Sequence, residues 1–199
     1  MSNTQTGTLA PLSPEPAPGL REQLAEALFV RIPEMGQDIA ARPVGGQHSL
    51  DFLRRLLTGA TPEEAATFVA YALGPRQSIW WGHECLQARP DLLTEMDRAM
   101  MALAAAWVGT PGEAARYAAL DAGQAAPARG PGVWLALAAG WSGGSMVGPD
   151  LPAVTVREFV LGRAVSAAVL TALARVPQEK RGRMLEHYIA MGEVLAKSA

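Results

Sequence analysis

Apolar residues recur at intervals of three or four positions along most of the chain, which is the period of an amphipathic α-helix. They keep this spacing over 20–32, and Pro33 ends the first predicted helix. Leucines keep it again over 50–57, where Ser49 is a suitable N-cap and Gly59 ends the helix. The pattern therefore predicts one helix over 20–32 and another over 50–57.

Proline and glycine divide the rest of the chain into further helices. Thr61 and Thr110 each stand before a proline, so that a hydroxyl cap and a proline begin a helix. Alanine is the commonest residue, and residues that favour strands are few. The sequence therefore predicts an all-α bundle of about eight helices. The later helices are expected over 62–73, 76–89, 91–108, 111–121, 131–141, 154–176 and 177–197.

One short segment occurs twice. Thr61-Pro62-Glu63-Glu64-Ala65-Ala66 recurs as Thr110-Pro111-Gly112-Glu113-Ala114-Ala115, and a tryptophan-bearing helix follows each copy. Helical repeats stack so that neighbouring units bury each other's apolar faces. We therefore predict repeat units over 50–90 and 91–142, with the helices over 153–197 acting as a C-terminal cap.

The first nineteen residues differ from the rest. Residues 1–19 are rich in proline and have little to bury, so we expect a disordered or polyproline-like tail before a single domain over 20–199. The tail has neither the positive charge nor the apolar core of a secretory signal. Cys85 is the one cysteine, which fits a reducing compartment. The expected location is the cytoplasm.

Charge argues against two classes of partner. The chain has 17 basic and 19 acidic residues and a net charge of −2, so no strong positive field is available for nucleic acid or an anionic membrane surface. The longest apolar stretches, 99–108 and 133–141, are about half of the roughly 20 residues that a membrane-spanning helix needs. We expect no membrane insertion and no nucleic-acid partner.

Two motifs suggest a nucleophile. Gly140-Trp141-Ser142-Gly143-Gly144 has the G-x-S-x-G spacing of hydrolases, but that motif requires a strand before the serine and a helix after it. His83-Glu84-Cys85 places a thiol beside an imidazole, although consecutive helical residues point about 100° apart. A helix end with a loop and a core cysteine are the preferred interpretations. No cofactor fingerprint or histidine pair spaced for a metal is present, so no cofactor and no metal are expected.

Tryptophan and arginine are common anchors of protein interfaces. Trp80 and Trp81 cannot share one helix face; alignment with Trp134 turns Trp80 inward and Trp81 towards a neighbouring helix or a partner. Burial in the core is the preferred interpretation for each tryptophan, and contact with a partner is the alternative. The candidate interaction residues are Arg76, Trp81, Trp141, Ser142, Gly143, Gly144 and Ser145.

The segments Gly74-Pro75-Arg76-x-x-x-Trp80-Trp81 and Trp141-Ser142-Gly143-Gly144-Ser145 resemble the signatures of an uncharacterised bacterial family of unknown function. The resemblance covers about 61–169 and leaves out the tail and the last helix. It implies an accessory or adaptor role beside type VI secretion components. It supplies no catalytic residue.

Three functions remain open from the sequence. The first is a non-enzymatic protein-interaction module, an adaptor or chaperone-like protein with a protein partner. The second is a small hydrolase that uses Ser142 or Cys85 as its nucleophile. The third is a helical bundle that binds an apolar small molecule in a cavity of about 300 Å³ or more.

Overall fold

The computed structural model describes residues 16–198, which form ten α-helices and one short 3₁₀ helix. In this part of the chain no residue belongs to a strand, and extended segments pair only at three isolated bridges. The predicted all-α class is confirmed. The elements are α1 (Ala25–Arg31), α2 (Met35–Asp38), α3 (Ser49–Leu57), α4 (Glu63–Ala72), α5 (Pro75–Gln87), η1 (Pro90–Leu92), α6 (Glu95–Gly109), α7 (Glu113–Ala125), α8 (Pro131–Gly140), α9 (Glu158–Ala174) and α10 (Gln178–Lys197).

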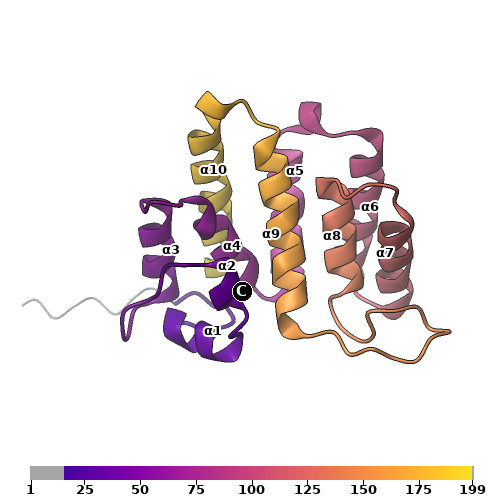
Figure 1. Cartoon of the computed structure of the whole chain (residues 1–199), viewed down its shortest axis with the longest axis horizontal. Helices are drawn as coiled ribbons and strands as arrows, with labels where there is room; N and C mark the ends of the chain where they lie inside the picture. The colour runs from indigo at the N-terminus through magenta and orange to yellow at the C-terminus, as the bar shows by residue number, and fades with distance from the viewer. Residues whose placement is uncertain (1–15, 199) are drawn as a thin grey trace, which may run out of the picture.

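Helix α9 lies in the middle of the bundle (Figure 1) and packs against α4, α5 and α8. On one side α8 packs against α6 and α7; on the other side α4 packs against α3 and α10. This position differs from the end cap predicted over 153–197, because α9 joins the two halves of the bundle. Its apolar side chains supply both halves with a shared core. The repeat itself stays a prediction.

The helix starts differ in detail from the predicted ones. Neither Thr61 nor Thr110 caps a helix with its side chain; the N-cap positions of α4 and α7 are Pro62 and Gly112. The cap predicted at Ser49 is also wrong, because His48 accepts the Leu50 N–H through Nδ1 (3.2 Å) and Ser49 is the first helical residue. A histidine ring nitrogen is an uncommon cap, and this explains why the sequence pattern favoured the neighbouring serine.

The predicted helix over 91–108 is divided in the structure. A 3₁₀ turn precedes α6, and Thr94 and Asp97 form a capping box in which each side chain accepts the other residue's backbone N–H. The predicted helix over 154–176 begins later, at Glu158. The preceding residues form a loop closed by a bridge between Ser145 and Thr155.

The packed chain begins before residue 20. Ala17 and Gly19 are both buried, and the Gly19 N–H donates to the Ala196 carbonyl (2.9 Å) at the end of α10. The Gly74 N–H donates in turn to the Gly19 carbonyl (3.3 Å). The boundary predicted at residue 19 is therefore too late, and the rest of the predicted tail lies outside the described residues.

Small residues bring the helices close together. In α8 every residue except Trp134 is buried, which accounts for one of the apolar stretches seen in the sequence. Within residues 16–198 no helix combines the length and apolarity needed to cross a bilayer.

Six helical glycines lie at helix contacts where an added Cβ would be less than 3.0 Å from a neighbouring helix: Gly82, Gly123, Gly132, Gly140, Gly162 and Gly192.

Gly162→Ala is expected to lower the free energy of unfolding by about 1–3 kcal/mol, because the added methyl overlaps the Tyr71 ring. Tyr71 is fully buried, and its hydroxyl donates to Asp38 (2.5 Å), so the ring cannot move aside. Gly182→Ala in α10 is the matched control, because that position has open space. It should raise stability by about 0.5–1 kcal/mol. Urea denaturation measures both, and stabilisation by Gly162→Ala would contradict the close contact of α4 and α9.

Asp97 joins the ends of three helices. Its carboxylate is 1% exposed and accepts the Gly132 N–H (3.1 Å) at the start of α8. It also accepts the Arg175 guanidinium (2.6 Å) at the end of α9, in addition to its bonds with Thr94 at the start of α6. One buried carboxylate therefore fixes α6, α8 and α9 relative to one another.

Candidate functional site

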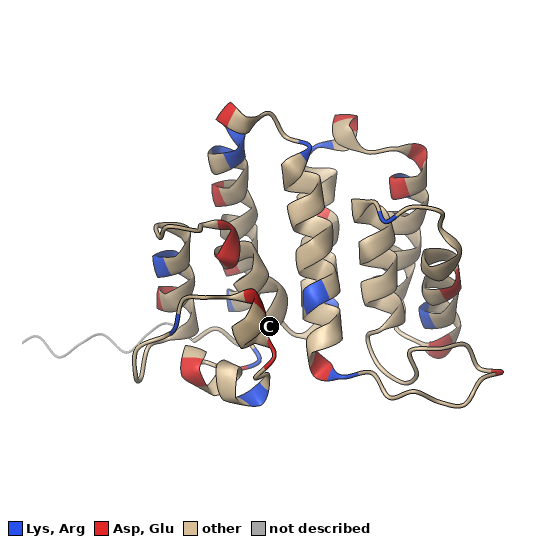
Figure 2. Cartoon of the chain, in the orientation of Figure 1, with Lys and Arg blue, Asp and Glu red and all other residues tan. Residues whose placement is uncertain are grey.

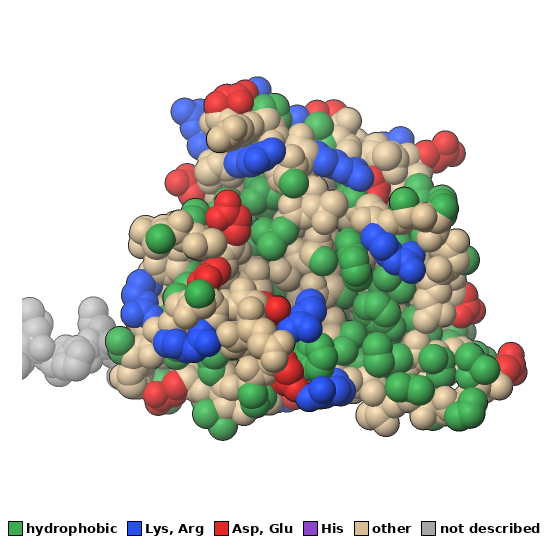
Figure 3. Space-filling view, in the orientation of Figure 1, with side chains coloured by type: hydrophobic (Ala, Val, Ile, Leu, Met, Phe, Trp, Pro, Cys, Tyr) green, Lys and Arg blue, Asp and Glu red, His purple; other side chains and the backbone are tan. Residues whose placement is uncertain are grey.

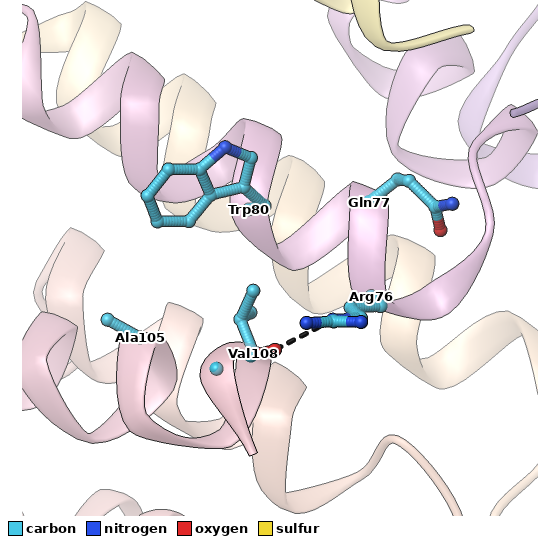
Figure 4. A pocket seen from close by; sticks show the side chains of 6 residues that line it. Arg76, Gln77, Trp80, Ala105 and Val108 are labelled. Carbon is cyan, nitrogen blue, oxygen red and sulfur yellow. Dashed lines mark hydrogen bonds between the residues drawn. The ribbon is translucent and has the colours of Figure 1, made fainter. Parts of the chain in front are cut away.

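A groove of about 440 Å³ lies between the first turns of α5 and the end of α6. Trp80 forms one wall, and Ala105 and Val108 of α6 lie opposite it (Figure 4). Arg76 lies at one end of the groove, one helical turn before Trp80, so both side chains project from the same face of α5. The groove therefore combines an aromatic wall, small apolar side chains and a cation.

Trp80 is half-buried and is held in place by its own helix. Its ring stacks on His83, with ring centroids 5.1 Å apart and planes 6° apart. His83 Nδ1 in turn lies 3.0 Å from the Glu84 carboxylate. The stacked histidine limits the rotation of the indole, so its exposed face is presented to the groove in a fixed orientation.

Arg76 is anchored by only one of its nitrogens. Nε donates to the Val108 carbonyl (2.7 Å), one of the last carbonyls of α6, where a cation is favourable. Within residues 16–198, neither Nη1 nor Nη2 makes a hydrogen bond. Arg76 was a sequence candidate, and the structure gives it a fixed position with two donors available to a ligand.

Trp81 is not available to a partner. It is completely buried, and its Nε1–H donates to the Tyr188 carbonyl (2.8 Å) of α10. The prediction of Trp81 as an interaction residue is therefore wrong, and the interpretation as a core residue is correct. Trp80, which the repeat alignment turned inward, is the tryptophan that lines the groove. Its repeat counterpart Trp134 is also half-buried.

The loop over 141–145 is shaped by a buried arginine. Arg116, which is 2% exposed, donates through Nη1 to the carbonyls of Gly140 (2.8 Å) and Ser145 (2.9 Å). Gly144 has φ +62° and lies against the guanidinium, where a Cβ would be 3.1 Å from Nη2. A left-handed residue in such contact favours glycine. Gly144 is thus explained by loop geometry.

Ser145 also has a structural role. It is buried, and its hydroxyl accepts the backbone N–H groups of Val147 (3.2 Å) and Val154 (3.1 Å). These bonds close the segment between α8 and α9. Of the five loop candidates, Gly144 and Ser145 therefore maintain the loop, and the other three are left for contact with a ligand or partner.

The remaining loop candidates meet the other signature segment. Trp141, Ser142 and Gly143 line a hollow of about 220 Å³, and Pro75 of α5 lines the same hollow. The two segments are far apart in the sequence, yet they lie together where α5 begins. Arg76, the next residue of α5, lines the groove, so both sites include a residue from the start of α5, although they share no lining residue.

A family model for a family of unknown function, DUF6931, matches residues 52–196. The chain belongs to this family. The match extends through α10, so the expectation that the last helix lies outside the similarity is wrong. No curated protein and no solved structure matches the chain.

The surroundings of the two nucleophile candidates in this DUF6931 protein differ from those of a catalytic nucleophile. Ser142 follows a helix and not a strand, and no hydrogen bond joins it to a histidine within residues 16–198. Cys85 is completely buried, and burial raises the pKa of its thiol. A thiol that resists ionisation is a poor nucleophile. No group of three His, Cys, Asp or Glu side chains in the described chain is arranged to hold a metal ion.

Proposed function

We propose that this DUF6931 protein is a non-enzymatic protein-binding module and that the groove between α5 and α6 receives an extended segment of a partner protein. The observation that carries the proposal is the fixed Trp80 ring beside the two available donors of Arg76. Tryptophan and arginine are the residues that most often dominate binding energy at protein interfaces.

The groove also specifies the chemistry of the partner segment. Arg76 pairs best with a carboxylate, because its guanidinium presents two parallel donors. Trp80, Ala105 and Val108 favour an apolar side chain close to that carboxylate. The partner segment is therefore an acidic residue next to an apolar one. The net charge of −2 gives the chain no strong positive field for nucleic acid, so the carboxylate contact depends on Arg76 itself.

An accessory or adaptor role in the cytoplasm, beside type VI secretion components, is part of the proposal. Its support is the resemblance carried by the segments 74–81 and 141–145. The single buried thiol, Cys85, is compatible with a reducing compartment.

A small apolar molecule is the competing occupant of the groove, because the volume of the groove lies within the usual range for small-molecule sites. A second apolar surface exists elsewhere on the molecule. Figure 3 shows hydrophobic side chains over the segment between α8 and α9, where Leu151 is 60% exposed and Val154 is 49% exposed. Peptide binding by matched variants distinguishes a peptide in the groove from a small molecule there and from binding at the second apolar surface.

Peptides selected from a random displayed library against the purified protein are expected to carry Asp or Glu beside an apolar residue. Trp80→Ala should weaken the binding of a selected peptide by about 30-fold, the equivalent of a 2 kcal/mol interface residue. Arg76→Gln should weaken it by about 10-fold, because one charged hydrogen-bonding pair is lost. Titration calorimetry with synthetic peptides measures both effects.

Two variants serve as controls. Arg183→Gln changes the charge equally at an exposed position of α10, and Leu151→Ser changes the second apolar surface. Both are expected to bind the peptide like the unchanged protein. The proposal is wrong if Leu151→Ser weakens binding and Trp80→Ala does not. It is also wrong if no peptide is selected and an apolar dye binds in the groove.

A further inference from the structure

The hollow beside the loop over 141–145 is rich in cations. Arg21, Arg31 and Arg157 line it, and Glu158 is the one carboxylate among its lining residues. Figure 2 shows acidic and basic residues side by side where α9 begins. The Glu158 carboxylate accepts from both Arg21 (2.6 Å) and Arg31 (2.8 Å), so one negative charge serves two guanidinium groups.

The other carboxylates nearby lie outside the lining. Arg31 also pairs with Glu22 (3.1 Å), and Arg157 pairs with Glu34. Arg157 is the N-cap of α9, and no side chain caps that helix start, so its positive end adds to the field of the arginines. Inside the hollow itself, positive charge exceeds negative charge.

Arg21 is the most deeply buried of the three arginines. Its side chain is 8% exposed, and Nε donates to the Leu73 carbonyl (2.8 Å). Burial lowers the pKa of this guanidinium, and the pairing with Glu158 offsets only part of the effect. A further negative charge in the hollow would therefore stabilise the charged form of Arg21.

Three residues that line the hollow carry hydrogen-bond donors without a protein acceptor. The Nε1–H of Trp141 is buried and has no hydrogen-bond partner. In the described chain the Ser142 hydroxyl and the Gly143 N–H also make no hydrogen bond. Ser142 and Gly143 are half-buried, so their donors are open to a ligand in the hollow, whereas the Trp141 N–H is covered by the protein.

We propose that this hollow is a binding site for a small oxyanion, a phosphate or carboxylate group of a small molecule. Such a group supplies further negative charge for the three arginines that line the hollow and acceptor oxygens for the donors of Ser142 and Gly143. The volume of about 220 Å³ admits the oxyanion with a few attached atoms. The site does not depend on the peptide groove, because Arg76 and Trp80 are not among its lining residues.

The test uses inorganic phosphate and succinate as probes, with sodium chloride at equal ionic strength as the reference. Titration calorimetry on the full chain is expected to show saturable binding of at least one probe. The stronger probe identifies the source of the oxyanion. Arg157→Gln should weaken binding by about fivefold, because one charge-assisted pair is lost from an exposed side chain. Ser142→Ala removes a hydroxyl donor that lines the hollow, and it should weaken binding by about threefold.

Arg183→Gln is the matched charge control and should leave binding unchanged, because Arg183 is exposed on α10. Trp80→Ala should also leave it unchanged, which separates this site from the peptide groove. Circular dichroism checks that each variant is folded. The proposal is overturned if neither probe binds beyond the chloride reference, or if Arg157→Gln and Arg183→Gln weaken binding equally.

Discussion

Asp97→Ala is expected to lower the free energy of unfolding by about 3–5 kcal/mol, the combined cost of a lost helix cap and of several lost hydrogen bonds to one buried carboxylate. The variant loses the capping box of α6, the acceptor for the first free N–H of α8, and the partner of Arg175. Because these bonds meet at one carboxylate, a single substitution loosens three helices. Urea denaturation followed by circular dichroism measures the change.

The same carboxylate predicts a pH dependence. Although burial opposes its ionisation, the hydrogen bonds from Arg175, Thr94 and Gly132 lower the pKa of Asp97 below its usual value. A carboxyl group whose pKa is lower in the folded state stabilises the fold above the unfolded pKa. That contribution is lost as the pH falls through the folded pKa. The stability difference between the unchanged protein and Asp97→Ala should therefore be constant near neutral pH and shrink below about pH 4.

Asp121→Ala is the control for both measurements, because Asp121 is exposed on α7. It should change stability by about 0.5 kcal/mol or less at any pH. If the two variants are equally stable, Asp97 does not hold the helix ends together.

Asp97 also illustrates what the sequence predicts and what it does not. The helical period and the proline and glycine breaks are local, so most helices were predicted within a few residues of their observed bounds. The partners Gly132 and Arg175 lie 35 and 78 residues further along the chain. No local pattern brings them to Asp97, and the same holds for the position of α9 between the two halves of the bundle.

The candidate site was predicted only in part. Arg76 and the segment 141–143 were selected because arginine, tryptophan and a glycine-rich loop suit an interface, and the structure places them at the groove and the hollow. Their meeting at the start of α5 depends on tertiary packing. Trp80 was missed because the helical period shows that adjacent tryptophans point apart, but not which one faces the core. The packing of α10 decides that point.

Trp81→Ala is expected to lower the free energy of unfolding by about 3–5 kcal/mol, whereas Trp80→Ala should lower it by about 1 kcal/mol or less. Trp81 is completely buried, so its removal leaves a cavity between α5 and α10 and deletes the bond to Tyr188. Trp80 is half-buried at the groove, where water fills the space that it leaves. Thermal and urea unfolding of the two variants measure the difference.

Peptide binding should show the reverse order once each variant is studied at a temperature where it is folded. Trp81→Ala retains the Trp80 ring and the Arg76 donors, so its folded fraction should bind the selected peptide within about threefold of the unchanged protein. Trp80→Ala keeps the fold and loses the groove wall. If both variants lose stability and binding in parallel, the groove has no role of its own. If Trp81→Ala loses more stability and Trp80→Ala loses more peptide binding, Trp81 belongs to the core and Trp80, the residue before it, to the binding surface.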